Sequence, residues 1–154
     1  MTWQLTVIGS PAPQGSKRFL GMGPKSGKAR FEEASKGVGP WREAVKTVAY
    51  ERRPHEPLDG PLFVRMVFTL RRPPSIPKRR RFPSTIPDLS KLARCTEDAL
   101  TEAGVWRDDA RVVEYLRLAK CYVGSLDPRV LDVPGVWIEI LTEEEWREML
   151  VAQP

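Results

Sequence analysis

The sequence predicts a single domain of the α/β (α+β) class, in which helices pack on one mixed β-sheet. Three observations support this class. The chain has 154 residues, which is the size of one average domain. Stretches of alternating apolar and polar residues, typical of strands, are interspersed with stretches of helical periodicity. No repeat and no linker divides the chain, so we expect one domain over residues 1–154 with the element order β-α-β-α-β-β-α.

The N-terminal third predicts a strand, a long loop and a helix. Residues 3–8 alternate between apolar and polar side chains and predict the first strand, which the Gly- and Pro-containing segment 9–13 ends. Residues 14–39 are rich in Gly, Ser, Lys and Arg, and we expect a long exposed loop there. Loops of this length inside a compact domain are often functional. A helix is expected from residue 40 to about residue 52, with Pro40 in its first turn.

The middle of the chain predicts a central strand, a basic loop and an amphipathic helix. Residues 61–70 carry apolar side chains on both faces, which indicates a strand that is covered on both sides. The prolines of residues 71–83 exclude a helix and a central strand, so this segment is expected to be an exposed loop. Residues 90–103 form an amphipathic helix, with Glu97 on its polar side and Gly104 as its cap.

The C-terminal third predicts two strands and a helix. Residues 111–122 and 135–141 are the expected strands. Thr142 and Glu145 lie three positions apart and form the pattern of a capping box. The final helix is therefore expected to span residues 143–151.

Composition limits the classes of function. Hydrophobic residues make up 41% and charged residues 29% of the chain, as in ordinary globular proteins. No apolar run approaches the ~18 residues of a membrane span, and the N-terminus lacks the basic and apolar regions of a secretion signal. We therefore expect a cytoplasmic protein without a membrane partner. Cys95 and Cys121 are expected to be buried and free, and the single His55 cannot complete a zinc site with them. A catalytic metal would need oxygen ligands, which favours Mg²⁺ or Mn²⁺.

Basic side chains are concentrated in the two expected loops. The net charge is +5, with 25 Lys and Arg against 20 Asp and Glu. General solubility explains such a charge as well as polyanion binding does, but basic loops also neutralise the DNA backbone with little sequence dependence. The residues expected to contact DNA are Lys17, Arg18, Arg71, Arg72, Lys78, Arg79, Arg80, Arg81 and Lys91.

Acidic residues at both ends of the 90–103 helix are the candidate catalytic groups. Asp88 precedes the helix, Asp108 and Asp109 follow it, and Arg94 and Asp98 lie four residues apart on its polar side. Taken singly, these residues fit a helix cap, a turn and a helical ion pair. Taken together, carboxylates that meet beside a basic loop fit phosphodiester cleavage, because divalent ions held by carboxylates activate water. We therefore expect the carboxylates of Asp88, Asp108 and Asp109 to lie close together.

Three spaced motifs resemble the signature of RusA-type Holliday junction resolvases. They are PDLSKLAR from Pro87, DAL from Asp98 and GVWRDD from Gly104, which are similar in order and spacing to the family patterns PDxDNLxK, DAL and GVxxDD. The segment that follows the first strand resembles the family's N-terminal turn more loosely. The resemblance implies a mixed α/β fold, a homodimer, and Mg²⁺-dependent cutting of branched double-stranded DNA. Two strands of a four-way junction would be nicked symmetrically, in DNA recombination and repair.

The resemblance also assigns roles to individual residues. Asp88 and Asp109 match the first and last catalytic aspartates, and Arg94 stands in the place of an essential lysine. Ser90 stands where a second catalytic aspartate is expected, and Lys91 where asparagine is usual. The implied metal ligands are Asp88, Asp108 and Asp109, with Ser90 and Asp98 as further candidates.

The missing carboxylate at Ser90 leaves several outcomes open. The protein is then an active enzyme with a rearranged metal shell, a weak enzyme, or a junction-binding protein that does not cut. A non-catalytic nucleic-acid-binding module also fits the basic loops. A small basic protein that recruits other proteins is a third hypothesis, but it leaves the acidic residues without a role.

Overall fold

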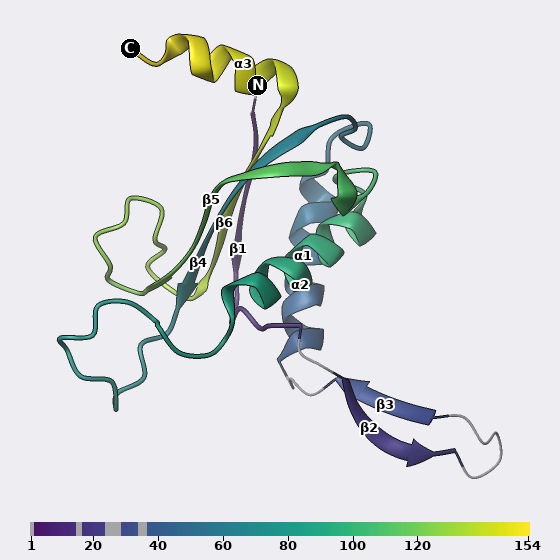
Figure 1. The fold of residues 1–154 in the computed structure, drawn as a ribbon, viewed down its shortest axis with the longest axis vertical. Helices are drawn as coiled ribbons and strands as arrows, with labels where there is room; N and C mark the ends of the chain where they lie inside the picture. The colour runs from purple at the N-terminus through teal and green to yellow at the C-terminus, as the bar shows by residue number, and fades with distance from the viewer. Residues whose placement is uncertain (1, 15–16, 24–28, 34–36) are drawn as a thin grey trace.

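The fold, described from a computed structural model, is a mixed β-sheet with two helices on one face (Figure 1). The structure describes residues 2–14, 17–23, 29–33 and 37–154, and only the backbone of residues 17–22 and 29–33. The elements in chain order are β1 (Trp3–Ile8), β2 (Lys17–Met22), β3 (Ala29–Glu33), α1 (Val38–Arg52), β4 (Leu62–Leu70), α2 (Leu89–Ala103), the short 3-10 helix η1 (Asp109–Arg111), β5 (Val112–Tyr122), β6 (Gly135–Thr142) and α3 (Glu143–Ala152).

The main sheet has four strands in the order β1-β6-β4-β5. β6 runs antiparallel to both β1 and β4, whereas β4 and β5 are parallel. The expected mixed sheet and α/β (α+β) class are confirmed. β4 is central and buried on both faces, as its apolar composition indicates. Parallel strands need a crossover connection, and α2 is the crossover from β4 to β5. α2 therefore begins near the carboxyl end of β4 and ends near the start of β5.

The prediction of a long loop over residues 14–39 is wrong. β2 and β3 form a separate antiparallel pair within it, and the register sets Lys17 opposite Glu33 and Arg18 opposite Glu32. The strand signal is weak because glycine and charged residues are depleted in strands. Complementary charges and one aromatic pair, Phe19 with Phe31, occupy facing positions and fit the pairing once the register is known. The other helices and strands lie within two residues of their expected bounds.

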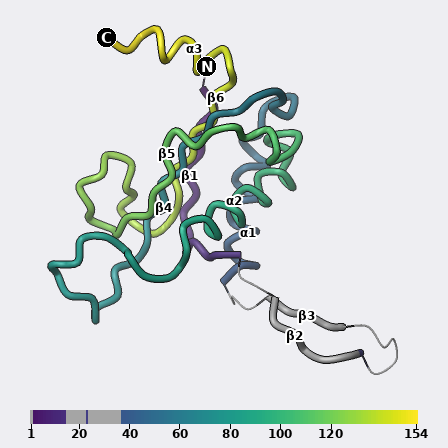
Figure 2. The backbone as a smooth tube through the Cα atoms, in the orientation of Figure 1, coloured from purple at the N-terminus to yellow at the C-terminus, as the bar shows by residue number. Residues whose placement is uncertain are grey.

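The core lies between the sheet and the two helices, which cover the same face (Figure 2). Trp41, Val45 and Ala49 of α1 are at most 1% exposed, so these side chains form the buried face of the helix. The indole Nε1 of Trp41 donates a hydrogen bond of 3.2 Å to Oγ1 of Thr96 in α2. This buried polar contact fixes α2 against α1 and thereby fixes the direction in which both ends of α2 point.

α3 begins with the predicted capping box. Oγ1 of Thr142 accepts from the backbone N–H of Glu145, whose side chain accepts from the backbone N–H of Thr142. The ring of Trp146 stacks on that of Phe63, with 4.6 Å between centroids and 5° between planes. This stacking holds α3 on the sheet. No helix in the described part of the chain is long and apolar enough to cross a bilayer.

Candidate nuclease site

Asp88 occupies the N-cap position of α2, but its side chain makes no capping hydrogen bond. The side chain is 55% exposed, and Nζ of Lys91 lies 3.6 Å from its Oδ2. An exposed ion pair of this length contributes little stability. The expected position of Asp88 at the helix cap is confirmed, but its side chain makes no capping hydrogen bond, and its carboxylate is accessible for another role.

Lys120 holds the segment that leads into Asp88. Its Nζ donates hydrogen bonds to the backbone oxygens of Thr85, at 2.7 Å, and Pro87, at 2.8 Å. The C-terminal part of β5 is thus fastened to the start of α2. The sequence analysis did not single out Lys120, because a lysine in a strand carries no signal that its partners are backbone oxygens in a distant loop.

Asp108 and Asp109 lie in a well-fixed turn at the other end of α2. Gly104 ends the helix in the left-handed conformation, with φ of 80°, as its predicted role as a cap requires. Trp106 is 1% exposed, and its Nε1 donates a 2.7 Å hydrogen bond to Oγ1 of Thr101. The GVW part of the motif is therefore the buried anchor, and it positions the two exposed aspartates that follow.

The two aspartates differ in their electrostatics. Asp108 accepts a 2.9 Å hydrogen bond from the backbone N–H of Ala110, and this bond holds the pKa of Asp108 below its ordinary value. The pKa of Asp109 is raised, first by its hydrogen bond with Asp108 and then by burial and by the charges of Asp108 and Asp98. Crowded carboxylates of this kind favour a neighbouring cation, since a positive charge relieves their repulsion.

Glu97 belongs to the same acidic group, although it was expected on the polar side of the helix. It is only 8% exposed, because β5 covers it and the hydroxyl of Tyr115 donates a hydrogen bond to its Oε1. Burial raises the pKa of Glu97 to about 6, and the charges of Asp109 and Asp98 also raise it. The apolar neighbours at positions 93 and 100, one helical turn away on either side, were the signal that position 97 faces inward.

The expected meeting of Asp88 with Asp108 and Asp109 does not occur within one chain. α2 has 15 residues, and a rise of about 1.5 Å per residue makes it roughly 22 Å long. The charge of Asp109 raises the pKa of Glu97, and the charge of Asp98 raises the pKa of Asp109. Glu97 and Asp98 lie roughly 14 Å along the helix axis from Asp88. Figure 1 shows the chain entering α2 from the loop after β4 and leaving it at the far end, toward β5. In the described part of the chain, no three His, Cys, Asp or Glu side chains gather closely enough to hold a metal. One chain alone does not fit a shared metal site.

The remaining candidates lie along α2 and on the basic loop. Ser90 and Arg94 are exposed, and Asp98 is half-buried; no ion pair joins Arg94 to Asp98 among the described residues. The basic side chains of this loop that are exposed are Arg71, Lys78, Arg79, Arg80 and Arg81. The backbone of β2 carries Lys17 and Arg18, whose side chains lie outside the described part of the chain.

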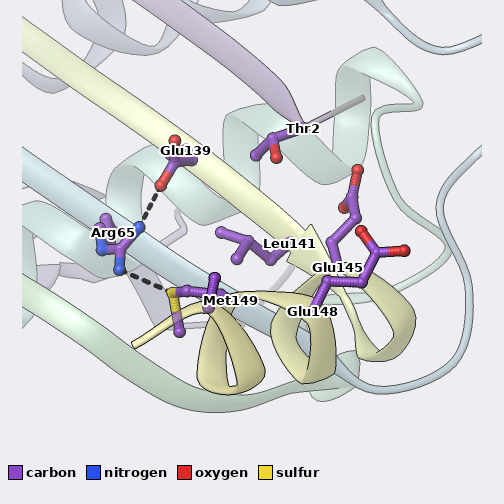
Figure 3. Close-up of a pocket in the computed structure, with 8 residues that line it drawn as sticks. Thr2, Arg65, Glu139, Leu141, Glu145, Glu148 and Met149 are labelled. Carbon is purple, nitrogen blue, oxygen red and sulfur yellow. Dashed lines mark hydrogen bonds and ion pairs between the residues drawn. The ribbon is translucent and has the colours of Figure 1, made fainter. Parts of the chain in front are cut away.

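A cavity of about 390 Å³ under α3 differs from the candidate site in its charges (Figure 3). Arg65 forms an ion pair with Glu139 there and also contacts the sulfur of Met149. Glu145 and Glu148 line the cavity as well. The cation is already paired and the other charges are negative, so the cavity repels phosphate, and we assign its ion pair to the packing of α3 on the sheet.

Comparison with known protein families identifies the set of motifs. The family model of the endodeoxyribonuclease RusA matches residues 9–140. The chain belongs to the RusA family. The match includes the basic loop, all of α2 and both of its acidic ends, so the resemblance in the three motifs is confirmed. Membership of the RusA family supports an endodeoxyribonuclease that resolves Holliday junctions in DNA recombination. No individual curated protein matches the chain.

Proposed function

We propose that the protein is a Mg²⁺- or Mn²⁺-dependent endonuclease that resolves Holliday junctions as a homodimer. The observation that carries the proposal is the accessible carboxylate of Asp88, which makes no capping hydrogen bond, in a chain that the RusA family model matches. Asp109 matches the last aspartate of the motif and has a raised pKa. Both groups are available, but they lie at opposite ends of α2.

A second copy of the chain can bring the two ends together. β5 lies at the edge of the main sheet, where it pairs with β4. Asp109 lies just before the first residue of β5, and Lys120, near its last residue, holds the segment before Asp88. If two copies pair through β5 in antiparallel fashion around a two-fold axis, the Asp109 end of each copy lies beside the Asp88 end of the other.

The charges along α2 and β5 support this pairing. The acidic side chains gather at the Asp109 end and are Glu97, Asp98, Asp108, Asp109 and Glu114. Lys91, Arg94 and Lys120 are basic side chains at the Asp88 end, whereas Arg107 and Arg111 at the acidic end are both paired with Asp59. An antiparallel copy sets the acidic end of one chain against the basic end of the other, which favours association. It also covers Val113 and Tyr115, which are 60% and 41% exposed on the edge strand.

The proposed site supplies carboxylates and the permanent positive charge of Arg94. Asp88 of one copy, with Asp108 and Asp109 of its partner, would hold the metal. When bound, a divalent ion activates water and neutralises charge at the scissile phosphate. Arg94 is exposed on α2 and permanently charged, so it stabilises the extra negative charge that the phosphate acquires in the transition state.

Mixing two inactive variants tests the composite site. Asp88→Asn and Asp109→Asn should each bind a four-way junction but not cut it in Mg²⁺. When the two are co-expressed, the mixed dimer has one site that lacks both aspartates and one intact site. It should therefore nick one strand of the junction. If the site lies within a single chain, every site in the mixture lacks one aspartate and no nick appears.

Non-catalytic junction binding is the second candidate function, and Ser90 favours it because a hydroxyl is a poorer ligand than a carboxylate for a hard cation. If the wild-type protein binds junctions without cutting them in Mg²⁺ or Mn²⁺, this second function holds. Ser90→Asp then tells a degenerate site from an absent one, since a restored ligand should produce cutting only where the other groups are in place.

A further inference from the structure

A groove of about 430 Å³ separates two loops at the carboxyl ends of β4 and β5. Arg72, Lys78, Arg81 and Phe82 line it from the loop after β4, and residues 122–126 line it from the loop after β5. Figure 2 shows both loops leaving the same end of the sheet. The basic loop of residues 71–83 forms one side of the groove, and none of the acidic residues lines it.

Arg72 lines the groove, and its side chain is held there by contacts within the protein. Its guanidinium donates a 2.7 Å hydrogen bond to the backbone oxygen of Arg80 and another to that of Pro77. The same group lies over the ring of Tyr122, 5.1 Å from the centroid. These two hydrogen bonds to the protein's own backbone give Arg72 a positioning role, and its expected contact with DNA stays a prediction. The bonds hold the loop in a shape that leaves Lys78 and Arg81 exposed.

Two large apolar side chains stand exposed on opposite sides of this groove. Phe82 is 70% exposed on one side, and Leu126 is 99% exposed on the other. Neither packs in the core clusters of the described chain. An exposed aromatic ring beside two cations matches a ligand that combines a flat apolar ring with a phosphate.

We infer that this groove binds one unstacked nucleotide at the branch point of the DNA, with its base against Phe82 and Leu126 and its phosphate near Lys78 and Arg81. The volume is that of a small-ligand site, which is roughly 300–1,000 Å³, and is too small for a duplex. Proteins that open DNA stacks often insert or stack on apolar side chains. The inference rests on the proposed function, because it names the feature of branched DNA that the junction endonuclease would recognise.

Binding without cutting tests the groove. Fluorescence anisotropy in EDTA would compare a plain duplex with the same duplex carrying one unpaired nucleotide. Phe82→Ala should weaken binding of the bulged duplex by at least about fivefold, the usual effect of one base stacked on an aromatic ring. Binding of the plain duplex and the salt dependence of both should stay unchanged. Phe82→Trp should restore the preference.

Ile86→Ala is the matched control, since Ile86 is 86% exposed on the same loop but does not line this groove. Equal losses on both duplexes, no loss on either, or the same loss in Ile86→Ala would overturn the inference. These outcomes are separate from those of the cutting assay. A wild-type protein that never cuts but prefers the bulged duplex through Phe82 contradicts the proposed nuclease alone. One that cuts junctions without any Phe82-dependent preference contradicts the groove alone.

Discussion

Glu97 is the residue whose surroundings differ most from those that its position in the sequence indicated. A carboxylate covered by β5 loses hydration, and one hydrogen bond from Tyr115 replaces only part of it. Its pKa of about 6 lies above its ordinary value of 4.5. The folded protein therefore holds the proton more tightly than the unfolded chain does. The stability from this group is complete below pH 4.5 and is lost as the pH rises through about 6.

Replacement of Glu97 by glutamine should remove this pH dependence. The amide oxygen can still accept from Tyr115, and no charge is buried at high pH. Urea unfolding should show Glu97→Gln more stable than wild type by about 2 kcal/mol well above pH 6, and little changed below pH 4.5. Glu148→Gln, at an exposed position, is the control. A difference between Glu97→Gln and wild type that is the same at all pH values would contradict the raised pKa.

Single residues also mark the limit of prediction from sequence at the site. The motif residues Asp88 and Asp109 could be named because their types and spacing match a family signature. Their separation could not, because spacing along the chain does not say whether a helix lies between two groups or brings them together. Lys120 and Arg72 were missed as positioning residues because both bind backbone oxygens, which every sequence segment offers.

Strand β6 depends on a close approach that only glycine permits. Gly135 pairs with Ile8 of β1. A Cβ added to Gly135 would overlap the backbone oxygen of Val7 and would lie 2.8 Å from Cδ1 of Leu131. The backbone of β1 cannot move away without breaking its pairing with β6, so the glycine is required for the two strands to meet.

Gly135→Ala should therefore destabilise the protein, at the upper end of the ~1–3 kcal/mol usual for overpacking or beyond it. Thr47→Ala serves as the opposite control, because Thr47 is exposed in the interior of α1. It should stabilise the protein by up to roughly 0.7 kcal/mol, because alanine has a higher helix propensity than threonine. Thermal unfolding of both variants would check the pair, and effects of the same sign would contradict the packing argument.

Most elements could be predicted because their patterns are local. The capping box of α3, the glycine cap of α2 and the apolar alternation of β4 each lie within a few consecutive residues. β2 and β3 could not be predicted in the same way. Their pairing depends on facing residues from two segments that are each poor in the side chains typical of strands.

Charge is unevenly distributed along α2 and β5, with mostly acidic side chains at one end and mostly basic side chains at the other. The net charge of +5 gives no hint of this, since acidic and basic side chains cancel in the sum. An excess of acidic groups at one end and of basic groups at the other would make this edge complementary to a second copy in the proposed pairing. Pairing through this edge would extend the sheet and close its longest open strand.

Cysteine cross-linking would test the pairing. Cysteines placed one at a time at Tyr115, Leu116 and Arg117, near the middle of β5, should include one position that forms a disulfide-linked dimer. Residues at a two-fold axis between antiparallel strands face their own copies, with Cα atoms about 4.5–5.5 Å apart, within the range of a disulfide. A cysteine at Glu51, exposed on α1, is the control. Cross-linking at no central position above this control would exclude β5 as the interface.

The length of α2 has a consequence for the control of DNA cutting in the cell. If the two halves of the cutting machinery lie too far apart on each molecule to work together, a solitary copy is harmless to the chromosome. At low abundance, activity would then grow with the square of the amount of protein made, so a doubling of expression would raise the activity about fourfold.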